Sequence, residues 1–167
     1  MITKYIDFKN FTLKKNNKKI KKDLNILLKE NNTVLKSLSS TYKNSYAKAT
    51  ILRFKKYSHI RVIGMGGSIL GTESIYNFLK KKIKKNFYFN NNLQPKIILH
   101  NKKKTLNLVV SKSGNTLETI SNSNVIIKNK NKNIFITENK ESYLYLLANK
   151  LKAEIIHHNN FIGGRYS

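Results

Sequence analysis

From His59 onward, short runs rich in β-branched residues alternate with longer segments of helical periodicity. This alternation predicts a parallel sheet with helices on both faces, because parallel neighbours are joined by crossover helices. The expected strands are 60–65, 86–90, 106–111, 133–137 and 153–157. The expected helices are 69–84, 117–128 and 141–151. The pattern is therefore that of an α/β domain built on five parallel strands.

The segment 96–100 also looks like a strand, but it lies only a few residues before the strand 106–111. Neighbouring parallel strands need a crossover of about a dozen residues or more. We therefore expect 86–90 to be the second strand and 95–102 to be a short crossover helix. Pro95 suits the first position of that helix, where a missing N–H costs nothing. His100 is then expected on the surface.

The chain before Tyr57 is expected to be helical. Ile20, Leu24, Leu27 and Leu28 follow helical spacing, and a second helix is expected over 45–56. A chain of 167 residues with 40% apolar content is long enough for one core. We expect residues 1–57 to form an N-terminal helical segment that packs on the sheet, and residues 58–167 to form the α/β domain.

The formal net charge of +25 is the most conspicuous feature of the composition. Thirty of the 33 cations are lysines and three are arginines, although nucleic-acid recognition relies on the bidentate arginine fork. The lysines are spread over the whole chain among many Asn and Ile residues, which favours a composition bias on solvated faces. A nucleic-acid-binding domain and attraction of small acidic substrates remain alternatives.

Other classes of protein are disfavoured by what the sequence lacks. No window approaches the roughly 20 apolar residues of a membrane span, and the N-terminus has no signal-peptide core. We expect a cytoplasmic protein with no membrane partner. The chain has no cysteine, which excludes disulfides, thiolate metal sites and a catalytic cysteine.

A glycine-rich loop, Gly64-Met65-Gly66-Gly67-Ser68, follows the first strand. Gly64 and Gly66 can take positive φ, and Ser68 can cap the next helix beside a bound anion. The loop is not a dinucleotide fingerprint, because Ile69 stands at the third glycine position. It is not a P-loop either, because Thr72-Glu73 replaces Lys-Ser/Thr. A tight turn without a ligand remains an alternative.

A second loop, Ser111-Lys112-Ser113-Gly114-Asn115-Thr116, is more specific. It places three hydroxyl groups around Gly114, directly before an expected helix whose first N–H groups and positive dipole end point at the same place. A single anionic group with several oxygens fits this site. Glu118 could act as a general base, but its place three residues after Asn115 favours a capping-box partner.

The expected topology indicates that the two loops form one site. Both leave the carboxyl ends of expected parallel strands, and ligands of open α/β sheets bind where the strand order reverses. If the first and third strands are neighbours, the loops face each other across that crevice.

Three segments together resemble the signature motifs of the first half of the phosphoglucose isomerase family. They are Gly64 to Gly71, Ser111 to Thr119 and Gly163-Gly164-Arg165-Tyr166-Ser167, in the family's order and with similar spacing. The resemblance is firm from His59 to the end and looser for the N-terminal helices. The second motif alone would indicate only a sugar isomerase (SIS) domain.

The resemblance implies a three-layer α/β/α fold, a five-stranded parallel sheet of order 2-1-3-4-5 and a set of residue roles. Ser111, Ser113 and Thr116, with the Lys112 backbone, would hold the 6-phosphate of the substrate within a loop that includes Gly114 and Asn115. Gly67 and Ser68 would contact the sugar. Arg165, with Gly164, would stabilise the anionic enediol intermediate, because a fixed guanidinium can stabilise developing charge.

The family interconverts glucose 6-phosphate and fructose 6-phosphate in glycolysis and gluconeogenesis, needs no cofactor or metal and usually forms homodimers. Its catalytic Glu, His and Lys come from a second half, and none of the four histidines here, His59, His100, His157 and His158, matches such a motif. We expect the chain to be the N-terminal portion of a longer enzyme and inactive alone. A non-catalytic SIS-type regulatory module that binds sugar phosphate remains the alternative.

Overall fold

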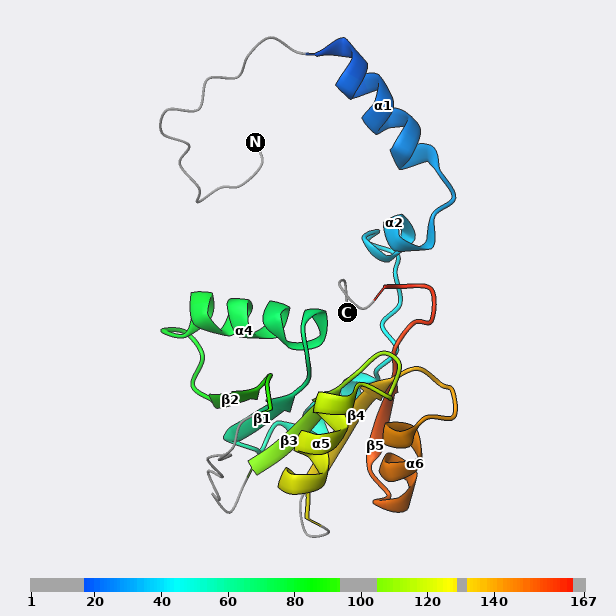
Figure 1. Cartoon of the computed structure of the whole chain (residues 1–167). Coiled ribbons are helices and arrows are strands. Elements are labelled where there is room, and N and C mark those ends of the chain that lie inside the picture. The colour runs from blue at the N-terminus through cyan, green and yellow to red at the C-terminus, as the bar shows by residue number, and fades with distance from the viewer. Residues whose placement is uncertain (1–16, 94–104, 129–131, 164–167) are drawn as a thin grey trace. The chain divides into compact units, whose positions relative to one another are not determined.

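The computed structural model describes residues 17–93, 105–128 and 132–163 (Figure 1). The chain divides into two compact units, residues 1–42 and residues 43–167. Three expectations lie outside the described residues: the crossover helix 95–102, the position of His100 and the placement of Gly164 to Ser167.

The described part of the first unit contains α1 (Lys18–Lys29), which the helical spacing predicted, and α2 (Thr33–Ser37), for which no spacing was noted. Each begins at an asparagine cap. The side chain of Asn17 accepts a hydrogen bond from the N–H of Lys19 at 3.1 Å, and that of Asn32 accepts one from Val34 at 2.8 Å. No described helix of the chain has the length and apolar content to cross a membrane.

The second unit is built on a five-stranded, all-parallel sheet. Its strands are β1 (His59–Ile63), β2 (Asn86–Asn90), β3 (Thr105–Val110), β4 (Lys132–Thr137) and β5 (Glu154–His157). The order is β2-β1-β3-β4-β5, which confirms the expected topology. Since β1 pairs with both β2 and β3, the strand order reverses beside it.

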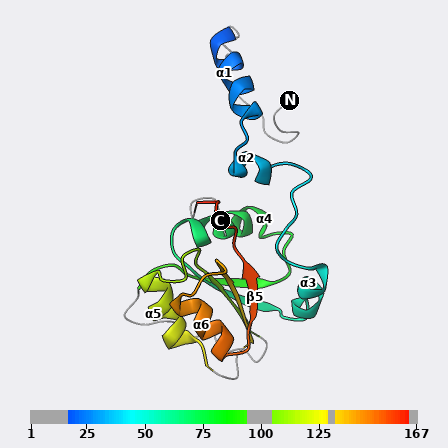
Figure 2. The same cartoon turned by 90° about the vertical axis from the view of Figure 1, so that its right-hand side faces the viewer.

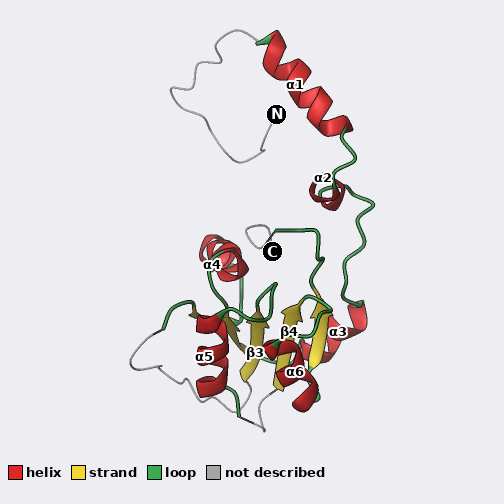
Figure 3. Ribbon diagram, turned by 45° about the vertical axis from the view of Figure 1, so that its right-hand side comes forward, coloured by secondary structure: helices red, strands yellow, loops and turns green. Residues whose placement is uncertain are grey.

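Helices cover both faces of this sheet, which confirms the three-layer arrangement. They are α3 (Lys48–Phe54), α4 (Gly67–Leu79), α5 (Leu117–Ile126) and α6 (Tyr143–Lys150). Figure 2 shows α5 and α6 on one side of the strands and α3 on the other, and Figure 3 shows the same helices around the strands from a third direction.

The alternation of side chains along the strands gives each face its own core. On the α5 and α6 side, Phe135 and Ile63 are fully buried in a cluster with Val109, Ile126, Leu144 and Ala148. On the other side, Ile69 of α4 is buried against Val62 and Val110. The consecutive apolar residues 62–63, 108–110 and 134–136 of β1, β3 and β4 follow from this two-sided burial.

Several element bounds differ from the expected ones. Helix α4 ends at Leu79 instead of continuing to residue 84, at the start of a lysine run whose like charges repel along a helix. Helix α6 begins after Ser142, whose hydroxyl accepts a hydrogen bond from the N–H of Tyr145 at 3.4 Å. Helix α3 is shorter than the expected 45–56.

A buried polar row crosses the sheet near the amino ends of its strands. The Arg61 guanidinium donates to Oδ1 of Asn107 at 3.4 Å, and the Asn107 amide donates to Oδ1 of Asn133 at 2.9 Å. All three side chains are buried, and burial lowers the pKa of Arg61 from its ordinary value. Asn107 is therefore the central link of a polar ladder joining β1, β3 and β4.

Replacing Asn107 by alanine should lower the free energy of unfolding by about 2 kcal/mol or more, because it leaves buried polar groups of both neighbours without this partner. Denaturant unfolding followed by circular dichroism measures the loss. The matched control is Asn124→Ala on the exposed surface of α5, where the amide accepts only from the Tyr143 hydroxyl. Equal stability of Asn107→Ala and Asn124→Ala would contradict the ladder.

Candidate functional site

The loop between β1 and α4 passes very close to the end of β3. A Cβ atom on Gly64 would lie 3.0 Å from the carbonyl oxygen of Val110 and 3.4 Å from Ser68. Gly64 is therefore needed for this close approach, whereas only Gly66 takes the positive φ expected of both, at 55°. The strand β1 ends at Ile63, before the expected 65, because the chain turns at these glycines.

The expected cap of α4 is wrong. Its N-cap residue is Gly66, which offers no side-chain cap, and Ser68 lies inside the first turn with its N–H bonded to the Met65 carbonyl at 3.2 Å. Gly67 and Ser68 are both half-buried. The helix begins earlier than expected because the conformation of Gly66 lets the turn close sooner. Its first N–H groups are left without a capping side chain.

The second loop, residues 111–116, is closed by its own hydroxyl groups. The Ser111 and Thr116 hydroxyl oxygens lie 3.0 Å apart across it, and the Asn115 N–H donates to the Ser113 hydroxyl at 3.2 Å. Ser111 is buried, whereas Ser113 and Asn115 are exposed. The loop therefore presents Ser113 and its backbone outward, with Ser111 at its base.

Gly114 fixes the shape of this loop. Its φ is 67°, and a Cβ atom there would lie 2.0 Å from the Ser142 hydroxyl oxygen and 2.9 Å from that of Thr137. The Gly114 carbonyl also accepts the N–H of Leu144 at 3.0 Å. The loop thus rests on the end of β4 and the start of α6. Thr137 and Ser142 were not singled out from the sequence. Thr137 ends an expected strand, and Ser142 directly precedes the apolar residues of α6.

Asn115 and Glu118 do not form the expected capping box. The Asn115 side-chain oxygen accepts from the N–H of Tyr143 at 2.9 Å, which ties the loop to α6. The N-cap of α5 is Thr116, and it makes no side-chain cap hydrogen bond. Because the Asn115 side chain bonds to the N–H of Tyr143 in α6, no side chain caps the first N–H groups of α5.

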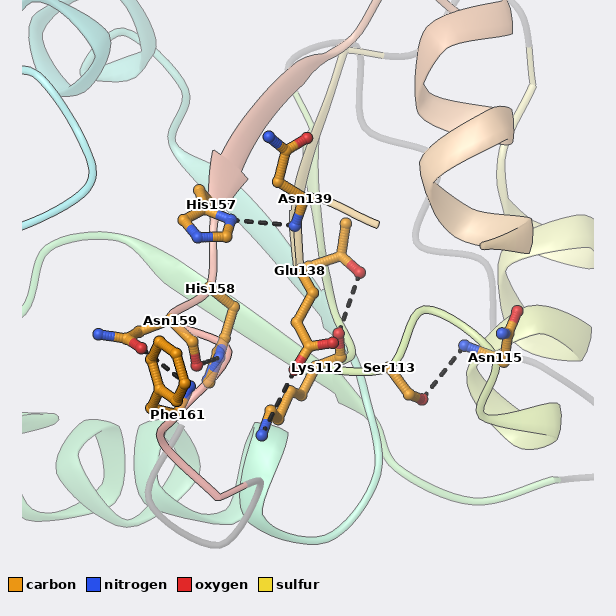
Figure 4. Close-up of polar contacts among 10 residues, drawn as sticks. Lys112, Ser113, Asn115, Glu138, Asn139, His157, His158, Asn159 and Phe161 are labelled. Carbon is orange, nitrogen blue, oxygen red and sulfur yellow. Dashed lines mark hydrogen bonds and ion pairs between the residues drawn. The ribbon is translucent and has the colours of Figure 1, made fainter. Parts of the chain in front are cut away.

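The Lys112 side chain turns to the neighbouring strand. Its Nζ lies 3.4 Å from Oε1 of Glu138, and the Lys112 carbonyl accepts the Glu138 N–H at 3.0 Å (Figure 4). Thr137 also donates its hydroxyl to that carbonyl, at 3.3 Å. Lys112 therefore contributes its backbone to the loop, while its ammonium group pairs with Glu138. Glu138 was not singled out from the sequence, where only its place after a strand distinguished it.

Two adjacent histidines at the end of β5 lie in different surroundings. His157 is exposed, and its Nδ1 accepts the N–H of Asn139 at 3.0 Å, whereas His158 is buried (Figure 4). Burial lowers the pKa of His158, which the Asn159 carbonyl partly offsets and the nearby Lys112 ammonium group reinforces. His158 is therefore neutral at neutral pH.

Pairing of β1 with β3 brings the two loops to one edge of the sheet. Ile63 lies opposite Val109, so the residues that follow each strand leave from neighbouring ends. Gly67 and Ser68 come from one side of this edge and Ser111 to Thr116 from the other. Gly164 and Arg165 lie outside the described residues, and the described chain leads to them through Gly163.

Known proteins resemble this chain in sequence. The model of the family "Phosphoglucose isomerase" matches residues 11–167. The glucose-6-phosphate isomerase of Borrelia garinii subsp. bavariensis is 34% identical over 131 residues, which are 68% of this chain and 25% of that protein. The chain thus spans about a quarter of the length of this curated relative.

Solved structures share the fold. A hypothetical protein from Thermus thermophilus superposes with a TM-score of 0.61 at 23% identity, over 71% of this chain and 33% of that one. Tagatose-6-phosphate ketose/aldose isomerase from Escherichia coli gives a TM-score of 0.52 at 20% identity, over 71% and 36%. With the family model matched over almost all of its length, the chain belongs to the phosphoglucose isomerase family.

Proposed function

We propose that residues 58–167 are a sugar-phosphate-binding domain of SIS type, and that the loop 111–116 holds the 6-phosphate of glucose 6-phosphate or fructose 6-phosphate. The observation that carries this proposal is the uncapped N-terminus of α5 beneath a loop of hydroxyl groups. Helix α4, which begins beside it, also lacks a side-chain cap. Uncapped helix N-termini offer N–H donors and positive dipole ends to an anion.

The loop can bind a phosphate without rearranging its frame. Hydrogen bonds to α6 and to Glu138 already fix its backbone, so little conformational entropy is lost on binding. Ser113 and Thr116 contribute hydroxyl donors, Ser111 supports Thr116 from below, and the Lys112 backbone completes the cradle. Gly67 and Ser68 would form the sugar side of the site.

Arg165, with Gly164, is proposed to stabilise the enediol intermediate of aldose–ketose isomerisation. Proton transfer between C2 and C1 places negative charge on sugar oxygens, and a guanidinium held in advance stabilises this charge without reorganisation. The base and the ring-opening acid of the family are not matched by motifs here. We infer that the whole protein is a cytoplasmic, cofactor-free homodimer acting in glycolysis and gluconeogenesis.

The exposed hydroxyl of Ser113 provides a test of phosphate binding. Replacing the exposed Ser113 by alanine should weaken binding of glucose 6-phosphate roughly three- to tenfold, because one hydrogen-bond donor to the phosphate is lost. Titration followed by phosphorus NMR measures the dissociation constant. Ser74→Ala, on the exposed face of α4, is the control, since neither substitution changes the net charge. Equal affinity of the two variants at fixed salt would argue for a diffuse lysine surface instead.

Turnover is a separate prediction. Purified residues 1–167 should bind glucose 6-phosphate but convert none of it to fructose 6-phosphate, because proton transfer needs a base that this chain does not supply in a recognised motif. A coupled assay of fructose 6-phosphate formation measures the rate. Sustained conversion above the rate of a matched blank would refute the assignment of the base to another part of the enzyme.

Gly114→Ala tests the shape of the loop. We expect the free energy of unfolding to fall by about 2–4 kcal/mol and phosphate binding to be lost, because alanine is strained at this φ and its Cβ would overlap Ser142. Thermal unfolding and the NMR titration measure the two effects. Gly71→Ala is the matched control, as no atom lies within 4 Å of a Cβ there and the helix gains propensity. Normal binding by Gly114→Ala would show that the loop tolerates another conformation.

A further inference from the structure

His158 is a buried titratable group that the proposed reaction does not use. It follows the last residue of β5, and its exposed fraction is 8%. Its N–H donates to the Thr137 carbonyl at 2.8 Å, which continues the β4–β5 pairing by one step. The side chain therefore sits at a fixed place beside the strand end that supports Gly114.

The His158 ring holds the turn that follows it. Its Nδ1 lies 3.0 Å from the carbonyl oxygen of Asn159, and because a carbonyl only accepts, Nδ1 carries the proton. The N–H of Ile162 donates to the same carbonyl at 3.1 Å, and the N–H of Phe161 donates to the Asn159 side chain at 2.9 Å. The turn 159–162 leads directly into Gly163 and, along the sequence, to Gly164 and Arg165.

Titratable groups from the neighbouring strand ends act on the same ring. They are Lys112 after β3, Glu138 after β4 and the adjacent His157 of β5. Lys112 and Glu138 are already paired at 3.4 Å, and their side chains are only 25% and 17% exposed. His158 thus stands where the phosphate loop, its acidic partner and the segment leading to Arg165 meet (Figure 4).

We propose that His158 is a positioning residue of the sugar-phosphate site: its ring fixes the turn 159–162, directly before Gly163, and leaves Glu138 paired with Lys112. This inference rests on the proposed function of the 111–116 loop and of Arg165. The Asn159 bond uses the Nδ1–H that both the neutral ring and the imidazolium carry, so burial and not this bond keeps the ring neutral. The neutral ring adds no charge to a pair that is already balanced.

Protonation of His158 would place a second cation beside one carboxylate. The imidazolium would compete with Lys112 for Glu138, and Coulomb interactions between partly buried charges are stronger than in water. Since the Glu138 N–H also bonds the Lys112 carbonyl, a shift of this residue reaches the backbone of the phosphate loop. The lowered pKa of His158 means that the neutral arrangement persists through neutral pH and is lost only as the pH falls through that pKa.

The test uses the full chain and three variants at pH 5 to 8. In His158→Asn the side-chain amide keeps a donor near the position of Nδ1 but does not titrate, and His158→Leu removes the donor. His157→Asn is the matched control at the exposed neighbour. Phosphorus NMR gives the affinity for glucose 6-phosphate, and proton–nitrogen NMR follows the backbone N–H groups of Lys112 and Gly163. Titration of the phosphate itself, with a second pKa of about 6, cancels in the ratio of variant to wild type.

We expect His158→Leu to bind roughly three- to tenfold more weakly at neutral pH, in keeping with one lost hydrogen bond, and His158→Asn to restore most of the affinity. The ratio of the His158→Asn affinity to the wild-type affinity should rise as the pH falls through the pKa of His158, because asparagine does not titrate, while the ratio for His157→Asn should stay constant. If the wild-type chain does not bind glucose 6-phosphate, the proposed function fails, and the Lys112 and Gly163 signals still decide the positioning role. Signals that do not move with His158 titration in the wild type, or that move equally in His158→Asn, would overturn it.

Discussion

Parallel pairing of β1 with β3 is the interaction on which the site depends. β1 comes first in the sequence of strands but lies between β2 and β3, so the connection after β1 leads to one side of the sheet and the connection after β3 leads to the other. Ligands of open α/β sheets bind in the crevice at such a reversal. The register places Ile63 beside Val109. Gly64 is consequently forced against the Val110 carbonyl, and a side chain at this point would push the two loops apart.

The residues that shape the phosphate loop differ from those that face the ligand. Gly114 packs against Thr137 and Ser142, and Asn115 binds the N–H of Tyr143, so the end of β4 and the start of α6 hold the loop in place. This frame leaves Ser113 exposed and α5 uncapped. A loop that is rigid before binding keeps more of its interaction energy for the ligand. Residues far from the phosphate thereby contribute to affinity.

The sequence predicted the strands and the two loops because these depend on local periodicity and on glycine placement, whereas the strand order was implied by the family resemblance. It failed where a side chain forms a hydrogen bond with a residue distant in sequence instead of with a local one. Asn115 and Glu118 have capping-box spacing, but Asn115 bonds α6 instead, and Ser68 lost its cap position because Gly66 closes the turn earlier. Thr137, Ser142 and Glu138 were missed for the same reason, since only the fold brings the end of β4 and the start of α6 beside residues 111–116.

The large positive charge gives the few acidic side chains particular importance. Against 33 cations the chain has eight carboxylates, and within the described residues two of them form ion pairs, Glu154 with Arg53 and Glu138 with Lys112. Removing one partner from a half-buried pair leaves the other charge poorly solvated. A neutral neighbour leaves such a pair undisturbed. Burial lowers the pKa of His158, so this ring adds no cation beside the pair at neutral pH.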